Sequence, residues 1–120
     1  MELTFYDQDG SPIAYTTDGE TIYLFEGEPV AYIHGNSVYS FHGTHIGWFE
    51  NGWLRDHHGA ALFFTDNASG RDPLRPLKQL KPLKSLRQLK PLKGLRQLKP
   101  IKPMTSFLWS DISPEEFFRS

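Results

Sequence analysis

The chain has 120 residues with 13 basic and 14 acidic side chains, giving a formal net charge of −1, and this length predicts a single domain. It contains no cysteine, which excludes a disulfide scaffold, a thiolate zinc site, a cysteine nucleophile and an iron–sulfur cluster. Its apolar runs are far shorter than the ~20 residues of a membrane-spanning helix. The start of the chain lacks the basic and apolar regions of a signal peptide, so we expect a cytoplasmic protein.

Charge divides the chain into parts. Residues 1–72 hold eleven acidic and two basic side chains, whereas residues 73–103 hold ten basic side chains and no acidic one. Such segregation is typical of a solvated interaction tail or of two parts of one assembly that attract each other. We therefore expect a body at 1–72, a repetitive tract at 73–104 and an apolar tail at 105–120.

The body is a repeat of glycine-centred turns. The segment Gly10-Ser-Pro-Ile-Ala-Tyr matches Gly27-Glu-Pro-Val-Ala-Tyr, and weaker copies begin at Gly43 and Gly59. Glycine supplies the positive φ that tight hairpin turns require, so each of these residues marks the tip of a β-hairpin. The pattern predicts an all-β fold, an eight-stranded up-and-down meander of four hairpins.

Both faces of these predicted strands are apolar. In residues 21–26, Ile22 and Leu24 alternate with Tyr23 and Phe25. An antiparallel sheet with one face in water carries polar side chains on that face. Another part of the chain, or another subunit, is therefore expected to cover the second face.

The tract consists of ten triplets of an apolar, a basic and a variable residue, from Leu74 to Ile101, with Met104 closing the series. A longer unit of nine residues is also visible, since Leu80–Gln88 repeats as Leu89–Gln97. A period of three fits neither an α-helix nor a strand, but it fits polyproline II. Thirty such residues span ~90 Å, about three times the width of the body. The tract must therefore wrap around the body, fold back or reach other subunits.

We interpret the leucine edge of this helix as the cover of the second sheet face, within one chain or across subunits, with the cations facing the acidic body. Replacing Leu83, Leu86 and Leu89 by Ser should then destabilise the protein far more than replacing Lys84, Arg87 and Lys90 by Gln, because apolar burial outweighs exposed ion pairs. The candidate interaction residues are Leu77, Lys78, Leu80, Lys81, Leu83, Lys84, Leu86, Arg87, Leu89 and Lys90.

The tail contains a helix start. Ser113-Pro114-Glu115-Glu116 places a capping serine before proline at the first helical position and glutamate at the third. Its aromatic residues are too apolar to stay in water, so we expect a short docked C-terminal helix.

The four Gly-Xaa-Pro-Ile/Val-Ala-Tyr-like hairpins, the Leu-Lys/Arg-Pro tract and the Ser-Pro-Glu-Glu-Phe-Phe end resemble the 4-fold β-flower proteins. These are small bacterial proteins whose hairpins radiate like petals around a shallow barrel. The fourth hairpin departs from the pattern, with Ala61 in place of proline and Phe64 in place of tyrosine. The resemblance implies the fold but no activity, so it transfers no catalytic residue. A loose likeness of such barrels to tubby-like and scramblase-like barrels suggests membrane surfaces by analogy alone.

Few residues suggest chemistry. Converging tips would bring Asp9, Glu26, His42 and His58 into a ring of metal-ligand character, whereas splayed tips would leave them as polar turn residues. Asp56 and His57 are adjacent, and neighbours on a strand point to opposite faces. No serine or threonine lies in a nucleophile-elbow motif. We expect no catalytic residue, no metal and no cofactor, and hence no enzyme.

The sequence therefore favours a structural or interaction protein that self-assembles into a homo-oligomer through the tract. A first alternative is a peripheral binder of anionic membrane surfaces, which would use leucines and cations together but would place unpaired backbone in hydrocarbon. A second alternative is a nucleic-acid binder that tracks phosphates, in which the leucine edge has no role. An acidic protein would be another partner of suitable charge.

Overall fold

The computed structural model describes residues 2–70 and 73–119 as an all-β body with one short helix. Each strand pairs antiparallel with the next one, and β8 returns to β1 through Tyr6 and Phe64, so the sheet closes into a barrel. The predicted eight-stranded meander is confirmed. The four hairpins consist of β1 (Leu3–Tyr6) with β2 (Pro12–Thr16), β3 (Thr21–Leu24) with β4 (Pro29–His34), β5 (Ser37–Tyr39) with β6 (His45–Glu50), and β7 (Trp53–Arg55) with β8 (Ala61–Phe64).

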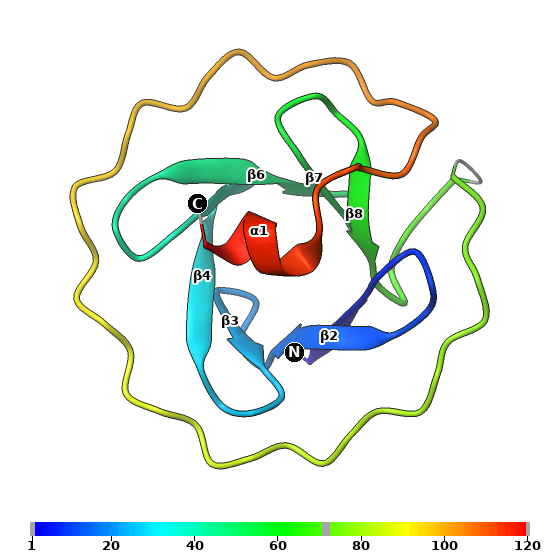
Figure 1. The fold of residues 1–120 in the computed structure, drawn as a ribbon. Coiled ribbons are helices and arrows are strands. Elements are labelled where there is room, and N and C mark those ends of the chain that lie inside the picture. The colour runs from blue at the N-terminus through cyan, green and yellow to red at the C-terminus, as the bar shows by residue number, and fades with distance from the viewer. Residues whose placement is uncertain (1, 71–72, 120) are drawn as a thin grey trace.

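The hairpin tips radiate from the barrel like petals (Figure 1). The glycine of each tip has a positive φ, from +80° at Gly10 to +103° at Gly27. The Gly27 N–H donates to the Leu24 carbonyl at 2.9 Å, and the other three tips repeat this bond. The prediction that these glycines mark the tips is confirmed.

A register shift occurs at the same place in every hairpin. It lies between Phe5 and Tyr6 in the first hairpin and between Ile22 and Tyr23 in the second. Such a bulge adds one residue to a strand and increases its twist. As a result, Phe5 and Ile22 belong to the barrel core, whereas the tyrosines that follow them belong to separate outer clusters.

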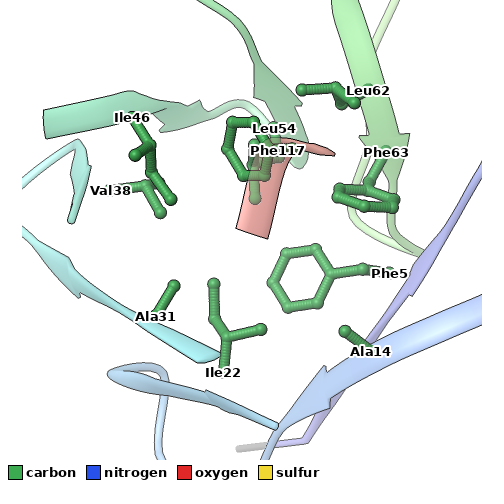
Figure 2. Close-up of a cluster of buried hydrophobic side chains, with 10 residues drawn as sticks. All are labelled: Phe5, Ala14, Ile22, Ala31, Val38, Ile46, Leu54, Leu62, Phe63 and Phe117. Carbon is green, nitrogen blue, oxygen red and sulfur yellow. The ribbon is translucent and has the colours of Figure 1, made fainter. Parts of the chain in front are cut away.

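The barrel core is narrow because large residues face small ones across the ladder. Phe5 pairs with Ala14, and Val38 pairs with Gly47. Helix α1 (Pro114–Phe118) closes one end by placing Phe117 in this core, as Figure 2 shows. A Cβ at Gly47 would lie 2.4 Å from the Arg55 carbonyl oxygen and 3.1 Å from the Phe117 ring, so the absence of a side chain there leaves room for both the neighbouring strand and the helix.

Helix α1 begins as the sequence predicts. The Ser113 side chain accepts a hydrogen bond from the Glu116 N–H at 3.1 Å, and Pro114 occupies the first turn. Among the described residues, this five-residue segment is the only helix, and none reaches the length and apolar character that crossing a bilayer requires.

Stacked aromatic pairs form the outer layer of the barrel, between neighbouring hairpins. The ring centroids of Tyr15 and Tyr23 are 5.8 Å apart, and those of Tyr32 and Tyr39 are 5.7 Å apart. A third pair joins Tyr6 and Phe64 across the closure of the barrel. We call these three contacts the aromatic pairs. They make the second face of the sheet apolar, as the strand pattern indicates.

Candidate functional site

Residues 74–106 run once around the barrel, outside the hairpin tips (Figure 1). The path touches one tip every nine residues. The carbonyl oxygens of Leu77, Leu86, Leu95 and Met104 lie so close to the four tip glycines that a Cβ on any of them would be 2.0–2.2 Å away. The nine-residue unit of the tract therefore corresponds to one hairpin of the body.

Backbone hydrogen bonds hold this ring to the tips. The N–H groups of Gln79, Gln88, Gln97 and Ser106 donate to the carbonyls of Gly10, Gly27, Gly43 and Gly59 at 2.8–3.0 Å. A second set donates from Ser85 to Phe25 and from Gly94 to Phe41. The equivalent positions in the neighbouring repeats are Pro76, nine residues before Ser85, and Pro103, nine residues after Gly94. Proline has no N–H to donate.

The length of the repeat fits the size of the barrel. Nine residues of polyproline II span about 28 Å, so residues 74–106 span about 100 Å. This length is close to the circumference of the molecule, whose two longer extents are both 36 Å and whose third is 24 Å. The tract thus closes around a disc without slack.

The basic residues of the ring lie over the aromatic pairs. The Lys84 Nζ is 4.6 Å from the ring centroid of Tyr15, and the Arg87 Cζ is 5.4 Å from that of Tyr23. Lys93 and Arg96 repeat these contacts nine residues later, on Tyr32 and Tyr39. Ammonium and guanidinium groups are attracted to the negative face of an aromatic ring, so two cations cap each of the two tyrosine pairs, and Lys78 alone lies over Tyr6 of the third pair.

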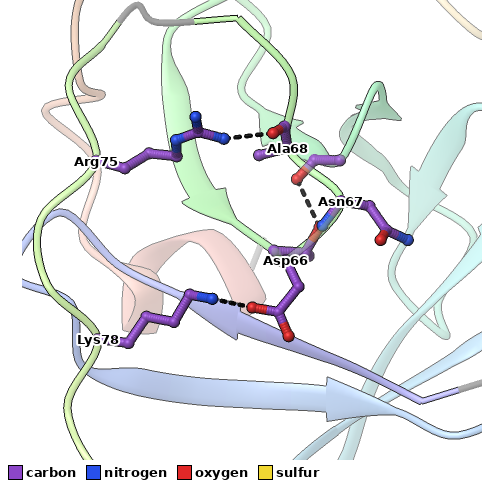
Figure 3. Close-up of polar contacts among 7 residues, drawn as sticks. Asp66, Asn67, Ala68, Arg75 and Lys78 are labelled. Atoms are coloured by element: carbon purple, nitrogen blue, oxygen red, sulfur yellow. Dashed lines mark hydrogen bonds and ion pairs between the residues drawn. The ribbon is translucent and has the colours of Figure 1, made fainter.

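Ion pairs reinforce this contact. Figure 3 shows Arg75 donating to the Ala68 carbonyl and Lys78 paired with Asp66. Lys93 pairs with Glu20 at 2.9 Å, and two more pairs join Lys84 to Glu2 and Lys102 to Glu50. The hydrogen bond from the Lys84 ammonium lowers the pKa of Glu2 below its usual value. One cation of each nine-residue unit remains: Lys81, Lys90 and Lys99. These lysines take part in none of the ion pairs or ring contacts found in residues 2–70 and 73–119.

The leucines point away from the body. Leu77 is 93% exposed and Leu80 is 96% exposed, so the prediction that the leucine edge covers the sheet is wrong. The tract does cover the second face, but with its cations. We call the outward residues the leucine belt: Leu74, Leu77, Leu80, Leu83, Leu86, Leu89, Leu92, Leu95, Leu98, Ile101 and Met104.

The hydrogen bonds explain this orientation. A helix with three residues per turn has three edges. The third residue of a triplet turns its N–H toward a hairpin tip, and the basic residue extends over the aromatic pairs. The apolar residue takes the remaining direction, toward solvent.

The ten candidate interaction residues are therefore divided between two surfaces. Leu77, Leu80, Leu83, Leu86 and Leu89 lie on the belt. Lys78, Lys84 and Arg87 face the body, and Lys81 and Lys90 make neither kind of contact. The sequence analysis missed the contact between cations and tyrosines, although a tyrosine four residues before three of the tip glycines was a signal for it.

The hairpin tips do not converge. Asp9, Glu26, His42 and His58 lie in the turns of four different hairpins, and the described residues contain no group of three or more His, Asp or Glu side chains that could hold a metal ion. The Asp56 carboxylate accepts hydrogen bonds from the N–H groups of His58 and Ala60 and from the Ser110 hydroxyl, whereas the His57 ring pairs with His45, so Asp56 shapes a turn.

A polar chain interrupts the outer layer between the third and fourth hairpins. His45 Nδ1 lies 2.9 Å from His57 Nε2, and His45 Nε2 lies 3.1 Å from the Ser37 Oγ. Burial of the His45 ring, helped by His57 and Lys99, lowers the pKa of His45 from 6.5 to about 4. A histidine of this pKa is neutral at pH 7 and a weak base, and Ser37 and His45 are each only 2% exposed. This arrangement satisfies buried polar atoms and is a poor catalytic centre.

Comparison with known proteins agrees with this geometry. The family model described as "4-fold beta flower protein" matches residues 3–118. Neither a curated protein nor a solved structure matches the chain.

Proposed function

Because this chain belongs to the 4-fold beta flower family, whose description names a shape and no activity, we propose a function from the surface that the shape displays. The protein is a non-catalytic structural protein that self-assembles through its leucine belt. The observation that carries this proposal is the exposure of the belt, from 78% at Leu74 to 96% at Leu80.

The size of the belt supports a partner. Burying one leucine side chain removes on the order of 100 Å² of apolar surface, so the belt displays roughly 1,000 Å². Soluble monomers rarely expose a continuous apolar patch larger than a few hundred Å². No segment of the described chain covers the belt, and a second copy is the partner that any solution of the protein contains.

The direction of the cations favours protein partners over phosphates. Seven basic side chains, Arg55 among them, lie over aromatic rings of the body, and four lysines pair with carboxylates. A nucleic acid or an anionic membrane would have to compete with these contacts. The outer edge of the tract presents the belt, its backbone and the exposed lysines Lys81, Lys90 and Lys99, and unpaired backbone groups are costly in hydrocarbon.

The proposal is tested by the mass of the protein in solution. Light scattering over a concentration series should show self-association, and it should be lost when Leu80, Leu89 and Leu98 are replaced together by Gln. Replacing Lys81, Lys90 and Lys99 by Gln is the matched control, because each lysine follows one of those leucines and makes no ion pair or ring contact. A protein that stays monomeric at every concentration would overturn the proposal.

A second arm distinguishes the other surfaces. The same proteins are mixed with phosphatidylcholine vesicles, with vesicles containing phosphatidylglycerol, and with duplex DNA. We expect no binding to any of them. Binding to the anionic vesicles or to DNA by a protein that is monomeric alone would replace self-assembly by the corresponding alternative.

A further inference from the structure

The shape of the belt indicates how copies would meet. Resting on the proposed self-assembly, we infer that the discs associate edge to edge into a layer one molecule thick, in which each copy contacts up to four neighbours through separate arcs of the belt. The partner is thus a second copy of this chain, and the interface is used several times by each copy.

Curvature limits any one contact. The ring has a radius of about 18 Å, and successive leucines lie about 9 Å apart along it. A leucine one step from the point of contact lies only about 2 Å behind the tangent, whereas one two steps away lies about 8 Å behind it. About three leucines of each copy therefore meet at one contact.

Such a contact is too small to hold a dimer. Three leucines from each partner bury roughly 600 Å² in total, whereas stable interfaces bury at least about 1,200 Å² and lattice contacts mostly less than about 800 Å². One contact leaves most of the belt exposed. Several simultaneous contacts per copy are needed before the assembly is stable, and a convex ring permits these only with several neighbours.

The repeat makes four arcs similar, each centred on one hairpin tip. Leu77, Leu86, Leu95 and Met104 lie at the four tips, and each has one exposed apolar residue three positions before it and one three positions after it. The four arcs are thus Leu74, Leu77 and Leu80; Leu83, Leu86 and Leu89; Leu92, Leu95 and Leu98; and Ile101, Met104 and Phe107. A surface repeated at each tip offers a similar contact in four directions. The ~9 Å spacing of the leucines also lets the side chains of one belt fit between those of the next.

The two faces of the disc disfavour stacking. Exposed acidic residues lie on the face closed by α1, at Asp111 and Glu115. Others, Asp18 and Glu20, lie at the turn between the first two hairpins. Neither face offers an apolar surface comparable with the belt, so growth is confined to the plane of the disc.

Variants that block chosen arcs test the layer. The first arc is blocked by Leu77→Gln with Leu80→Gln, and the third arc, across the disc, by Leu95→Gln with Leu98→Gln. Leucines exposed by more than 90% can be replaced without loss of packing, and the circular dichroism spectrum and thermal unfolding of each variant, measured in the monomeric fraction, check this. Sedimentation velocity and electron micrographs report the assemblies.

We expect wild-type mass to rise with concentration without reaching a plateau, and micrographs to show flat sheets. Blocking the first arc should leave open assemblies, and blocking the first and third arcs should leave single rows. A dimer, or a closed oligomer that one blocked arc abolishes, would overturn the layer but leave self-assembly standing. A wild-type protein that stays monomeric would overturn both, and three-dimensional stacks would refute the lateral geometry.

Discussion

The capping of the aromatic pairs leads to a quantitative prediction for the double variant Lys84→Gln, Arg87→Gln. Both cations lie over one aromatic pair, with Lys84 4.6 Å from the Tyr15 ring and Arg87 5.4 Å from the Tyr23 ring. Lys84 also pairs with Glu2, and the Arg87 guanidinium donates to the Thr17 hydroxyl at 3.0 Å. The variant removes all four interactions and leaves the leucine belt unchanged.

The expected loss follows from the exposure of these groups. A cation over an exposed ring contributes about 0.5–1 kcal/mol, a surface ion pair about 0–1 kcal/mol and a hydrogen bond about 0.5–1.5 kcal/mol. Together they stabilise this part of the ring by about 2–4 kcal/mol. Since about 1.4 kcal/mol is a factor of ten, local detachment of the tract should become roughly 30- to several hundred-fold more frequent.

Amide hydrogen exchange measures this detachment directly. The N–H groups of Ser85 and Gln88 donate to the Phe25 and Gly27 carbonyls, so their exchange rates report how often this part of the tract detaches from the second hairpin. The control is Lys81→Gln with Lys90→Gln, which changes the net charge equally at positions flanking the same segment. It should alter these rates by only about twofold, as surface substitutions do.

Two results would refute this reasoning. If the control accelerates exchange as much as the double variant, the tract is held by overall charge attraction and not by the capped rings. If neither variant accelerates it, the backbone bonds alone suffice. The structure also reverses the expectation from the sequence that the leucine replacements destabilise the protein more than the charge replacements. Replacing Leu83, Leu86 and Leu89 by Ser should leave amide exchange and monomer stability nearly unchanged, because these side chains are 93–95% exposed.

Three further predictions concern the body. Gly27→Ala should lower the melting temperature more than Gly35→Ala. Both glycines have positive φ, but a Cβ at Gly27 would lie 2.1 Å from a backbone oxygen, whereas a Cβ at Gly35 would meet nothing within 4 Å. Equal melting temperatures would contradict the tight approach of the ring to the tip. The free energy of unfolding should fall as the pH drops from about 6.5 toward 4, by up to about 1.4 kcal/mol per pH unit, because the folded state holds the pKa of His45 near 4 and the unfolded chain binds the proton first. Urea titrations of His45→Gln should show a smaller slope, and an unchanged slope would assign the effect to other groups. Phe117→Ala should lower stability by about 3–5 kcal/mol in denaturant unfolding, and a loss below about 1 kcal/mol would mean that α1 does not close the core.

The sequence by itself determines the local parts of this protein. Glycine is needed where φ is positive, so the tips at Gly10 and Gly27 can be read from their spacing. The cap at Ser113 and the period of three in the tract are equally local. Each depends on the conformational preference of a few neighbouring residues, and the structure has each of them where the pattern places it.

Only the tertiary structure decides which edge of the tract faces the body. A period of three residues gives the tract three edges, carrying leucines, cations and backbone N–H groups, and the period does not say which edge faces the body. Burial energies alone favour the leucine edge for that position when the groups on the body are not known. The hairpin tips present carbonyls that the tract meets once every nine of its own residues, and the bulges turn tyrosines toward the ring. Hydrogen bonds between fixed backbone groups set the rotation of the tract, and the cations then reach the tyrosine rings. The leucines take the remaining direction, toward solvent. The positions of the carbonyl acceptors depend on the closed barrel, so the sequence of the tract alone cannot predict this orientation.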